Sequence, residues 1–281
     1  MTVDRPLLRY HGGKFLLSPW IIEQLPPHKI YTEPFGGAAS VLLKKPRCYS
    51  EVYNDMDSEV VNLFRVLRDP SLNRELVRLV SLTPYAREEF ELSLIAIDDP
   101  LEQARRTLFR FAAGYSTAGI DPSGWGTGFR GNVTQSGSIP AHSWRSFPNH
   151  LDAIIDRLTG VVIENIPACE LLQKYDTADT LHYCDPPYPF STRNSRWAGN
   201  AYRHEMSDDD HREMSSVLHR LAGMVVISGY PCDLYDQELF PDWKRVTRET
   251  SADGGRKRTE VLWVNPAAEA RNWPLLDLIK K

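Results

Sequence analysis

The residues best suited to chemistry in this sequence are Asp185-Pro186-Pro187-Tyr188, which follow the apolar run 180–184. In open α/β sheets, ligands bind where parallel strands end. Two consecutive prolines remove two N–H donors and stiffen the backbone, which leaves nearby carbonyls unpaired. A carboxylate and a fixed carbonyl can accept both protons of an aromatic amine, and a tyrosine ring can stack on a base lifted out of a duplex. The plainer interpretation is a Pro-Pro turn with an ordinary loop aspartate.

A glycine-containing turn at residues 33–40 (EPFGGAAS) follows a short strand candidate at 29–33. Glycines after a strand let a ligand approach the backbone closely, although this spacing is not GxGxxG. The sequence has no GKS or GKT here, so a P-loop is excluded. Asp55 ends the next strand candidate, where an acid hydrogen-bonds ribose hydroxyls in dinucleotide folds. The alternative role for Asp55 is a helix N-cap, which Asp57 could fill equally well.

The elements that must position these residues follow an α/β order. We expect helices at 14–25 and 55–67 and strands at 29–33 and 48–54. The middle changes character: three helices are expected at 72–80, 85–97 and 101–113, followed by a polar, Gly-rich stretch at 114–142 that suits a functional segment. The α/β pattern then resumes with strands at 161–165, 180–184 and 224–228, helices at 168–175 and 208–221, and a loop at 189–206. We expect Ser207 to cap the second of these helices. A final antiparallel pair, 246–250 and 260–265, is joined by a basic turn at 252–258.

Composition narrows the class of protein without deciding it. The 281 residues are 42% hydrophobic and 25% charged, which is a globular balance. The four cysteines are scattered and no His pair has ligand spacing, so we expect neither a disulfide framework nor a metal site. We also expect no membrane span, no signal peptide and a cytoplasmic location. The net charge of −4 gives no support for DNA, but residues 244–258 carry six basic side chains against two acids.

Together these motifs resemble the DNA adenine methyltransferase family, amino-methyltransferases that include enzymes modifying GATC. The N-terminal segment 10–14 (YHGGK), the turn 33–41, Asp55 and the motif 185–188 stand in the family's order along essentially the whole chain. The resemblance implies a Rossmann-like α/β sheet that binds S-adenosylmethionine, with a mainly helical inserted recognition domain. The catalytic domain would comprise residues 1–67 and 161–281, and the insertion residues 68–160.

The resemblance also implies site residues. Residues 34–38 would wrap the methionine end of the cofactor, Asn165 and Ile166 would flank its adenine, and Asp185 with the Pro186 carbonyl would hold the target amine. Tyr188 would stack on the base. The implied catalytic residues are Asp185, Pro186, Pro187 and Tyr188, and the implied cofactor residues are Tyr10, Lys14, Glu33, Pro34, Phe35, Gly36, Gly37, Ala38, Asp55, Asn165, Ile166 and Asp185. Relatives often have Trp where this chain has Tyr10.

Double-stranded DNA would be held by two groups of residues. Arg256, Lys257 and Arg258, in the basic turn, suit phosphate contacts that set affinity but not sequence. Trp125, Phe129, Arg130 and Asn132 combine stacking surfaces with groups able to bond base edges. The alternative is that Trp125 and Phe129 are core residues and Arg130 is a surface charge. Because 114–142 does not resemble the loop of the GATC readers, GATC specificity does not follow.

Several functions remain open from the sequence. The leading one is methylation of the adenine N6 amine in duplex DNA by base flipping, but the same motif could act on the cytosine N4 amine or on RNA. A non-catalytic DNA-binding module would have no need for all four residues of 185–188. A nicotinamide dehydrogenase is disfavoured by the glycine spacing. A separately acting restriction endonuclease is a possible partner, and the target site and oligomeric state stay open.

Overall fold

The computed structural model describes residues 2–10, 12–115, 128–131, 139–193, 202–251 and 257–272. Within these ranges the strands form one seven-stranded sheet in the order β3-β2-β1-β4-β5-β7-β6. The strands are β1 (Ile30–Glu33), β2 (Ser50–Asn54), β3 (Val162–Glu164), β4 (Thr180–Cys184), β5 (Met224–Gly229), β6 (Lys244–Ser251) and β7 (Lys257–Val264). Strands β3, β2, β1, β4 and β5 run parallel, and β7 and β6 add an antiparallel pair at one edge.

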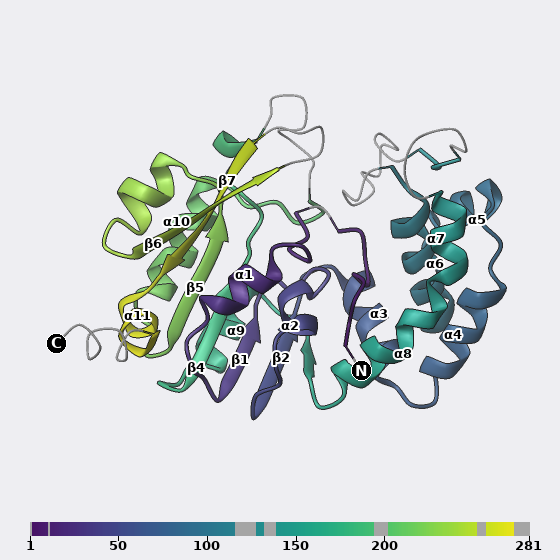
Figure 1. The fold of residues 1–281 in the computed structure, drawn as a ribbon, viewed down its shortest axis with the longest axis horizontal. Helices are drawn as coiled ribbons and strands as arrows, with labels where there is room; N and C mark the ends of the chain where they lie inside the picture. The colour runs from purple at the N-terminus through teal and green to yellow at the C-terminus, as the bar shows by residue number, and fades with distance from the viewer. Residues whose placement is uncertain are drawn as a thin grey trace.

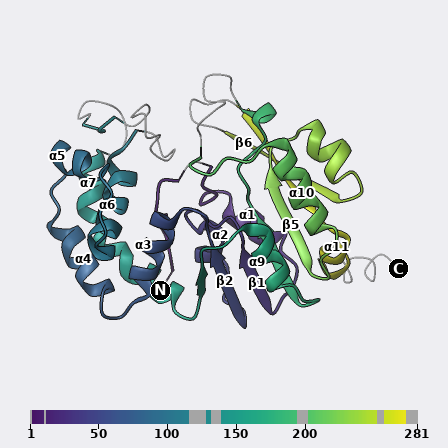
Figure 2. The same ribbon diagram turned by 180° about the vertical axis from the view of Figure 1, so that it is seen from behind.

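The central strands are apolar because helices cover both faces of the sheet. Every residue of β4 and β5 is buried, as expected for parallel strands covered on both sides. Neighbouring residues of β5 serve different cores: Val226 packs into one, while Val225 and Ile227 pack into the other. Helix α1 (Ser18–Glu23) lies on the face seen in Figure 1, and α9 (Ala168–Lys174) and α10 (Asp208–Leu218) lie on the face seen in Figure 2.

A second group of helices stands beside the β3 edge, on the right in Figure 1. We call residues 73–158 the helical region; it contains α4 (Asn73–Leu82), α5 (Arg87–Leu92), α6 (Pro100–Ala113), α7 (Pro140–Ser146) and α8 (Pro148–Leu158). Helix α3 (Ser58–Arg68) contacts β3, α4, α6 and α8, so it joins this region to the sheet. The apolar core is continuous across the junction, since Phe64 of α3 and Phe109 of α6 belong to the same buried cluster.

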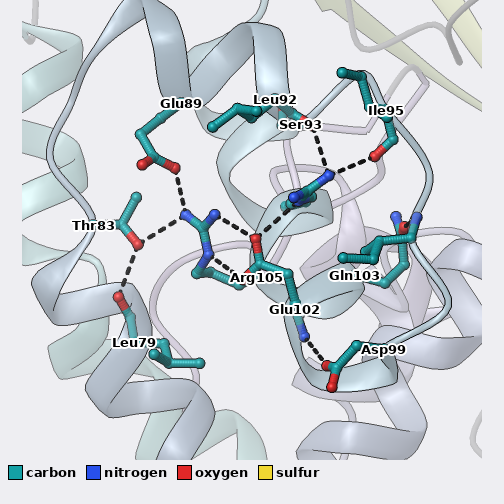
Figure 3. Close-up of polar contacts among 12 residues, drawn as sticks. Leu79, Thr83, Glu89, Leu92, Ser93, Ile95, Asp99, Glu102, Gln103 and Arg105 are labelled. Carbon is teal, nitrogen blue, oxygen red and sulfur yellow. Dashed lines mark hydrogen bonds and ion pairs between the residues drawn. The ribbon is translucent and has the colours of Figure 1, made fainter.

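A buried arginine ties three helices of the helical region together (Figure 3). The Arg105 guanidinium of α6 donates to Glu102 at 2.7 Å, to Glu89 of α5 at 2.7 Å and to the Thr83 hydroxyl after α4 at 3.1 Å. The neighbouring Arg106 donates to the carbonyls of Leu92 and Ile95, which holds the chain after α5 against α6. Asp99 caps α6 by accepting from the Glu102 amide at 2.7 Å.

Most elements expected from the sequence are confirmed within a few residues, including the Ser207 cap of α10. That cap is a reciprocal capping box with Asp210. Two expectations are wrong. Helix α7 begins at Pro140, inside the stretch expected to lack regular structure, because proline suits the first turn of a helix. The final hairpin is longer than expected, so Lys257 and Arg258 lie in β7 and not in the turn.

Four further elements in the described residues were not expected: α8, the 3-10 helix Phe190–Thr192, the π-helix Leu234–Leu239 and α11 (Pro266–Asn272). In the described part of the chain, no helix combines the length and the apolar character that crossing a bilayer requires.

Candidate active site

The expected site residues meet at one edge of the sheet because they follow the carboxyl ends of adjacent parallel strands. Glu33 ends β1, Asp55 follows β2 and Asp185 follows β4, and β1 pairs with both β2 and β4. From β1 the chain continues to β2 on one side and reaches β4 on the other. This reversal is the point at which ligands bind in open α/β sheets.

A cavity of about 380 Å³ lies at this edge. Four expected segments contribute to it: the N-terminal segment, the glycine turn, the start of α3 and the end of β4. Its lining includes Tyr10, Gly12, Gly13, Lys14, Glu33, Pro34, Phe35, Gly36, Gly37, Ala38, Asp55, Asp185 and Pro187. Pro186 and Tyr188 do not line the cavity, because both residues are buried. Asn165 and Ile166 are also absent from the lining, where Pro167, Ala168 and Cys169 stand instead.

The glycine turn needs glycine at two positions. A Cβ on Gly36 would lie 2.2 Å from the Tyr53 ring, which leaves no room for a side chain. Gly37 has a φ of +47°, in the left-handed region, and a Cβ there would lie 3.0 Å from the Tyr10 ring. The Tyr53 hydroxyl donates to the Gly37 carbonyl at 2.7 Å. The backbone of this turn therefore forms the cavity wall directly.

Asp55 is held by backbone donors, and its other proposed role falls to a neighbour. Its carboxylate accepts from the amides of Gly37 at 2.7 Å and Asp57 at 2.8 Å. Asp57, and not Asp55, caps α3 by accepting from the Glu59 amide. Loss of water around Asp55 raises its pKa to about 6, against the lowering effect of these two hydrogen bonds. A charged acceptor that titrates near neutrality thus faces the cavity.

Asn54 and Asn165 connect residues 165 and 166 to the site by hydrogen bonds, although neither of those residues lines the cavity. Its side-chain amide donates to the carbonyls of Pro34 at 2.8 Å and Ile166 at 3.0 Å, and it accepts from the Ile166 amide at 3.0 Å. Asn165 donates to the Asp55 carbonyl at 2.7 Å. These bonds fix the glycine turn, Asp55 and the chain before α9 to one another. Asn54 was not among the residues expected at the site.

The Asp185 carboxylate is paired on one oxygen only. Lys14 Nζ lies 2.9 Å from Asp185 Oδ1, and the Ser228 hydroxyl donates to the same oxygen at 2.7 Å. Among the described residues, none donates to Oδ2 or to the Pro186 carbonyl. These are the two acceptors that the sequence predicts for an amine. The Tyr188 carbonyl is different, because the Arg193 guanidinium donates to it at 2.8 Å.

Glu260 of β7 completes this cluster and was not expected from the sequence. Its carboxylate accepts from the Tyr188 hydroxyl at 2.6 Å and lies 3.6 Å from Lys14 Nζ. Burial raises the pKa of Glu260, and Lys14 opposes that shift. Burial would lower the pKa of Lys14, but Asp185 and Glu260 outweigh it and raise that pKa. Lys14 is therefore a buried cation between two acids, 4.8 Å from the centre of the Tyr188 ring.

Tyr188 is only 5% exposed, and its ring packs edge-on against Tyr230 at 4.7 Å. Stacking of Tyr188 on a base stays a prediction, and it requires the ring to become accessible from the cavity. Glu33 is also buried. It accepts from the Tyr31 hydroxyl at 2.7 Å and the Leu42 amide at 2.6 Å, and burial raises its pKa to about 7. Its hydrogen bonds thus fix β1 to α2 (Ser40–Lys44) beneath the cavity.

The segment 202–206 closes one side of the cavity, although the sequence suggested only a polar loop there. Arg203 reaches across to the start of α3, where it pairs with Asp57 at 3.0 Å and Glu59 at 2.9 Å. Arg193 pairs with Glu205 at 2.7 Å and so fixes the base of this segment. The sequence shows that this segment is charged, but only the fold shows that Arg203 contacts the start of α3.

The expected DNA-binding residues are partly described. Trp125, Asn132 and Arg256 lie outside the described residues, and so does His11. Phe129 is half-buried, with Tyr85 at 5.2 Å, Phe90 at 5.9 Å and the Arg87 guanidinium at 5.1 Å from its ring. This packing favours the alternative interpretation of Phe129 as an anchor of the helical region.

Two of the basic residues expected at DNA have contrasting surroundings. The Arg130 amide donates to the Ala113 carbonyl at 2.8 Å, and its own carbonyl accepts from Tyr85. Within the described ranges, its side chain makes no hydrogen bond or ion pair. Arg258 donates to the Tyr230 hydroxyl at 3.0 Å and lies over that ring at 5.0 Å. No group of three His, Cys, Asp or Glu side chains able to hold a metal occurs in the described ranges.

Comparisons with known proteins point in the same direction as the geometry. Residues 10–92 match the family described as "D12 class N6 adenine-specific DNA methyltransferase". The chain is 25% identical to the DNA adenine methylase of Escherichia coli (strain K12), over 93% of this chain and 95% of that one. It is 25% identical to the DNA adenine methylase of Serratia marcescens, covering 86% and 88%. It is 22% identical to the type II methyltransferase M.MjaIII of Methanocaldococcus jannaschii, covering 92% and 96%. The family resemblance drawn from the motifs is confirmed.

Proposed function

Because this chain belongs to the DNA adenine methyltransferase family, we propose that it transfers a methyl group from S-adenosylmethionine to the N6 amine of adenine in a specific duplex DNA site. The observation that carries the proposal is the pair of free acceptors beside the cavity, Asp185 Oδ2 and the Pro186 carbonyl. Both follow β4, so their spacing is fixed by one short rigid segment. The base must leave the duplex to reach them.

The cavity has the features that S-adenosylmethionine would require. The backbone of Gly36 and Gly37 lines the cavity, and the rings of Tyr53 and Tyr10 pack so closely against it that the turn has no room for a side chain. Asp55 would accept from the ribose hydroxyls, and residues 34–38 would surround the methionine end. Asn165 and Ile166 would position the adenine-facing wall at Pro167 through Asn54. When bound, the cofactor supplies an electrophilic methyl group on a positively charged sulfur.

The protein's part in the reaction is to make the amine nucleophilic. Asp185 and the Pro186 carbonyl would accept the two N6 protons, which favours a lone pair on nitrogen over its delocalisation into the ring. S-adenosylmethionine, held by residues 34–38 and Asp55, would supply the methyl group to this nitrogen, with its sulfur as the leaving group. One N6 proton leaves through Asp185 Oδ2 towards solvent. Lys14 orients Asp185, since its Nζ lies 2.9 Å from the other carboxylate oxygen.

The test is methyl transfer from labelled cofactor to duplex DNA in the presence of a chelator, followed by digestion and identification of the methylated base. We expect N6-methyladenine and no metal requirement. Asp185→Ala should abolish transfer, because it removes the charged acceptor, while cofactor binding measured by calorimetry should persist. Methylcytosine as the only product would assign the reaction to the cytosine amine. Near-normal turnover by Asp185→Ala would overturn the mechanism.

A further inference from the structure

A second cavity, also of about 380 Å³, lies between the N-terminal segment and the helical region. Its floor is apolar and aromatic, formed by Leu108 of α6, Trp144 of α7, and Phe147 between α7 and α8. Its rim carries Arg5, Arg9 and Arg130. Among the described residues that line it, no carboxylate balances these three guanidinium groups. On a protein with a net charge of −4, this is a local concentration of positive charge.

Two of the three arginines have their charge available. In the described part of the chain, no hydrogen bond or ion pair engages the side chain of Arg9 or Arg130. Arg9 is exposed, and its charge acts on the hydroxyl of Tyr85, which itself donates to the Arg130 carbonyl. Arg9 and Arg130 are therefore neighbours, although 121 positions separate them. Their fixed forks suit the oxygens of a phosphate.

Two contacts hold the Arg5 side chain at the same cavity. It donates to the Ser146 hydroxyl at 3.1 Å, and its guanidinium lies 5.9 Å from the centre of the Phe147 ring. The Phe147 ring in turn stacks on Trp144 at 5.7 Å with a 10° angle between planes. The three arginines repel one another, because no carboxylate lines the cavity with them. This repulsion destabilises the folded state unless a bound anion offsets it.

The N-terminal segment is shared by the two cavities. Tyr10, Gly12, Gly13 and Lys14 line the candidate active site, while the preceding Arg5, Pro6, Leu7 and Arg9 line the second cavity. The segment runs between the sheet and the helical region in both ribbon views. The two cavities are therefore joined by one short segment of the chain, residues 5–14.

We propose that the cavity lined by Arg5, Arg9 and Arg130 binds a backbone phosphate of the DNA strand that carries the target adenine. The inference rests on the proposed function, which supplies the DNA. It adds Arg5 and Arg9, which the sequence did not single out, and it assigns Arg130 to the backbone and not to a base edge. Such a contact sets the position of the strand and is blind to its sequence.

The salt dependence of DNA binding tests the assignment. Each phosphate contact contributes about 0.9 to the slope of log K against log salt on duplex DNA. We expect Arg9→Gln and Arg130→Gln each to reduce the slope, and the double variant by no more than about one unit because both side chains contact one phosphate; binding should weaken by the same factor on cognate and unrelated duplexes. The matched control is Arg220→Gln, at an exposed position two residues after α10 and outside the lining of both cavities; it removes the same charge and should leave the slope unchanged.

The remaining measurements separate the alternatives. Arg5→Gln should give the same loss, and Arg9→Gln keeps the test valid if thermal unfolding shows that Arg5→Gln has disturbed the Phe147 contact. Wild-type slopes in both Arg9→Gln and Arg130→Gln would overturn the proposal. A loss confined to the cognate sequence would also overturn it, because it would indicate base recognition.

Free anions are tested with inorganic phosphate and pyrophosphate by calorimetry. Binding of either at micromolar concentration, together with an unchanged DNA slope, would show that the cavity serves a free anion and would overturn the assignment to DNA. Binding slopes are measured without turnover, so absence of methyl transfer by the wild-type protein would contradict the proposed function and leave this result standing.

Discussion

At the scale of single residues, Glu260 links the two parts of the catalytic cluster. It accepts from Tyr188 and lies beside Lys14, which holds Asp185. Glu260 itself does not reach the proposed substrate, so we assign it a positioning role. Removing its carboxylate leaves the buried Tyr188 hydroxyl without an acceptor, at a cost of about 1–3 kcal/mol.

We expect Glu260→Ala to lower kcat for methyl transfer by tenfold or more with little change in the KM for the cofactor. Glu260→Gln should recover much of the rate, since its amide oxygen can still accept from Tyr188. A double-mutant cycle with Tyr188→Phe, measured in single turnover, checks the route of the effect. If the Tyr188–Glu260 bond carries it, the two losses are strongly non-additive. Full additivity would contradict this interpretation.

At the scale of elements, the helical region depends on α6. Its Arg105 contacts α5 and the end of α4 at once, and the side chain is only about a tenth exposed (Figure 3). Buried charge-assisted hydrogen bonds of this kind contribute about 1.5–3 kcal/mol each, and loss of the arginine leaves Glu89 and Glu102 without that partner. The helices that carry the second cavity should therefore loosen together.

We expect Arg105→Ala to lower the free energy of unfolding by about 2–4 kcal/mol, measured by chemical denaturation. The matched control is Arg78→Ala on α4, whose pair with Glu75 at 2.6 Å is exposed. An exposed pair contributes between about 0 and 1 kcal/mol, so the control should change little. Equal effects of the two substitutions would show that the Arg105 network does not hold the region.

At the scale of the whole molecule, the candidate active site joins segments from most of the chain. A ligand there contacts the N-terminal segment, the glycine turn, Asp55 and the segment 202–206 together. Binding to the folded state alone stabilises a protein by RT ln(1 + [L]/Kd), which is about 2.7 kcal/mol at a hundredfold excess over Kd. S-adenosylmethionine should therefore raise the melting temperature of the entire protein in one transition.

That stabilisation should depend on pH through Asp55. Its pKa of about 6 means that the carboxylate is charged at pH 8 and largely protonated at pH 5, so the increase in Tm with cofactor should shrink as the pH falls through 6. The protein without cofactor should respond in the opposite sense. The pKa of Asp55 is higher in the folded state, about 6, than its ordinary value of 3.8. This difference stabilises the folded state fully below pH 3.8, and the stabilisation is lost as the pH rises through 6.

Thermal unfolding with and without cofactor at pH 8 and pH 5.5 measures both effects. Asp55→Ala should weaken cofactor binding, by about 1.5–3 kcal/mol if one charged hydrogen bond is lost. It should also reduce the pH dependence of the increase in Tm that the cofactor causes, although Glu33 still titrates near 7. Asp242→Ala, at an exposed position without a role in the site, is the control. An identical increase in Tm for Asp55→Ala and wild type would contradict the ribose contact.

Features that depend on neighbouring residues could be predicted from the sequence. Glycines at 36 and 37 permit a tight turn, two prolines after a buried strand stiffen the backbone, and Ser207 caps α10, so each segment predicts its own conformation. The motif at 185–188 and Asp55 were placed correctly at strand ends for this reason. The family also follows from such segments, because their order along the chain carries the resemblance.

The contacts between residues far apart in the sequence could be seen only in the folded protein. Lys14 contacts Asp185, Glu260 contacts Tyr188, and Arg9 shares a cavity with Arg130 because the sheet order and the packing of α6 bring those segments together. None of these pairs is close in sequence, so no periodicity or spacing reports them. The length of the β6–β7 hairpin was missed for the same reason. Pairing across strands, not the propensity of residues 257–259, extends β7 through Lys257 and Arg258.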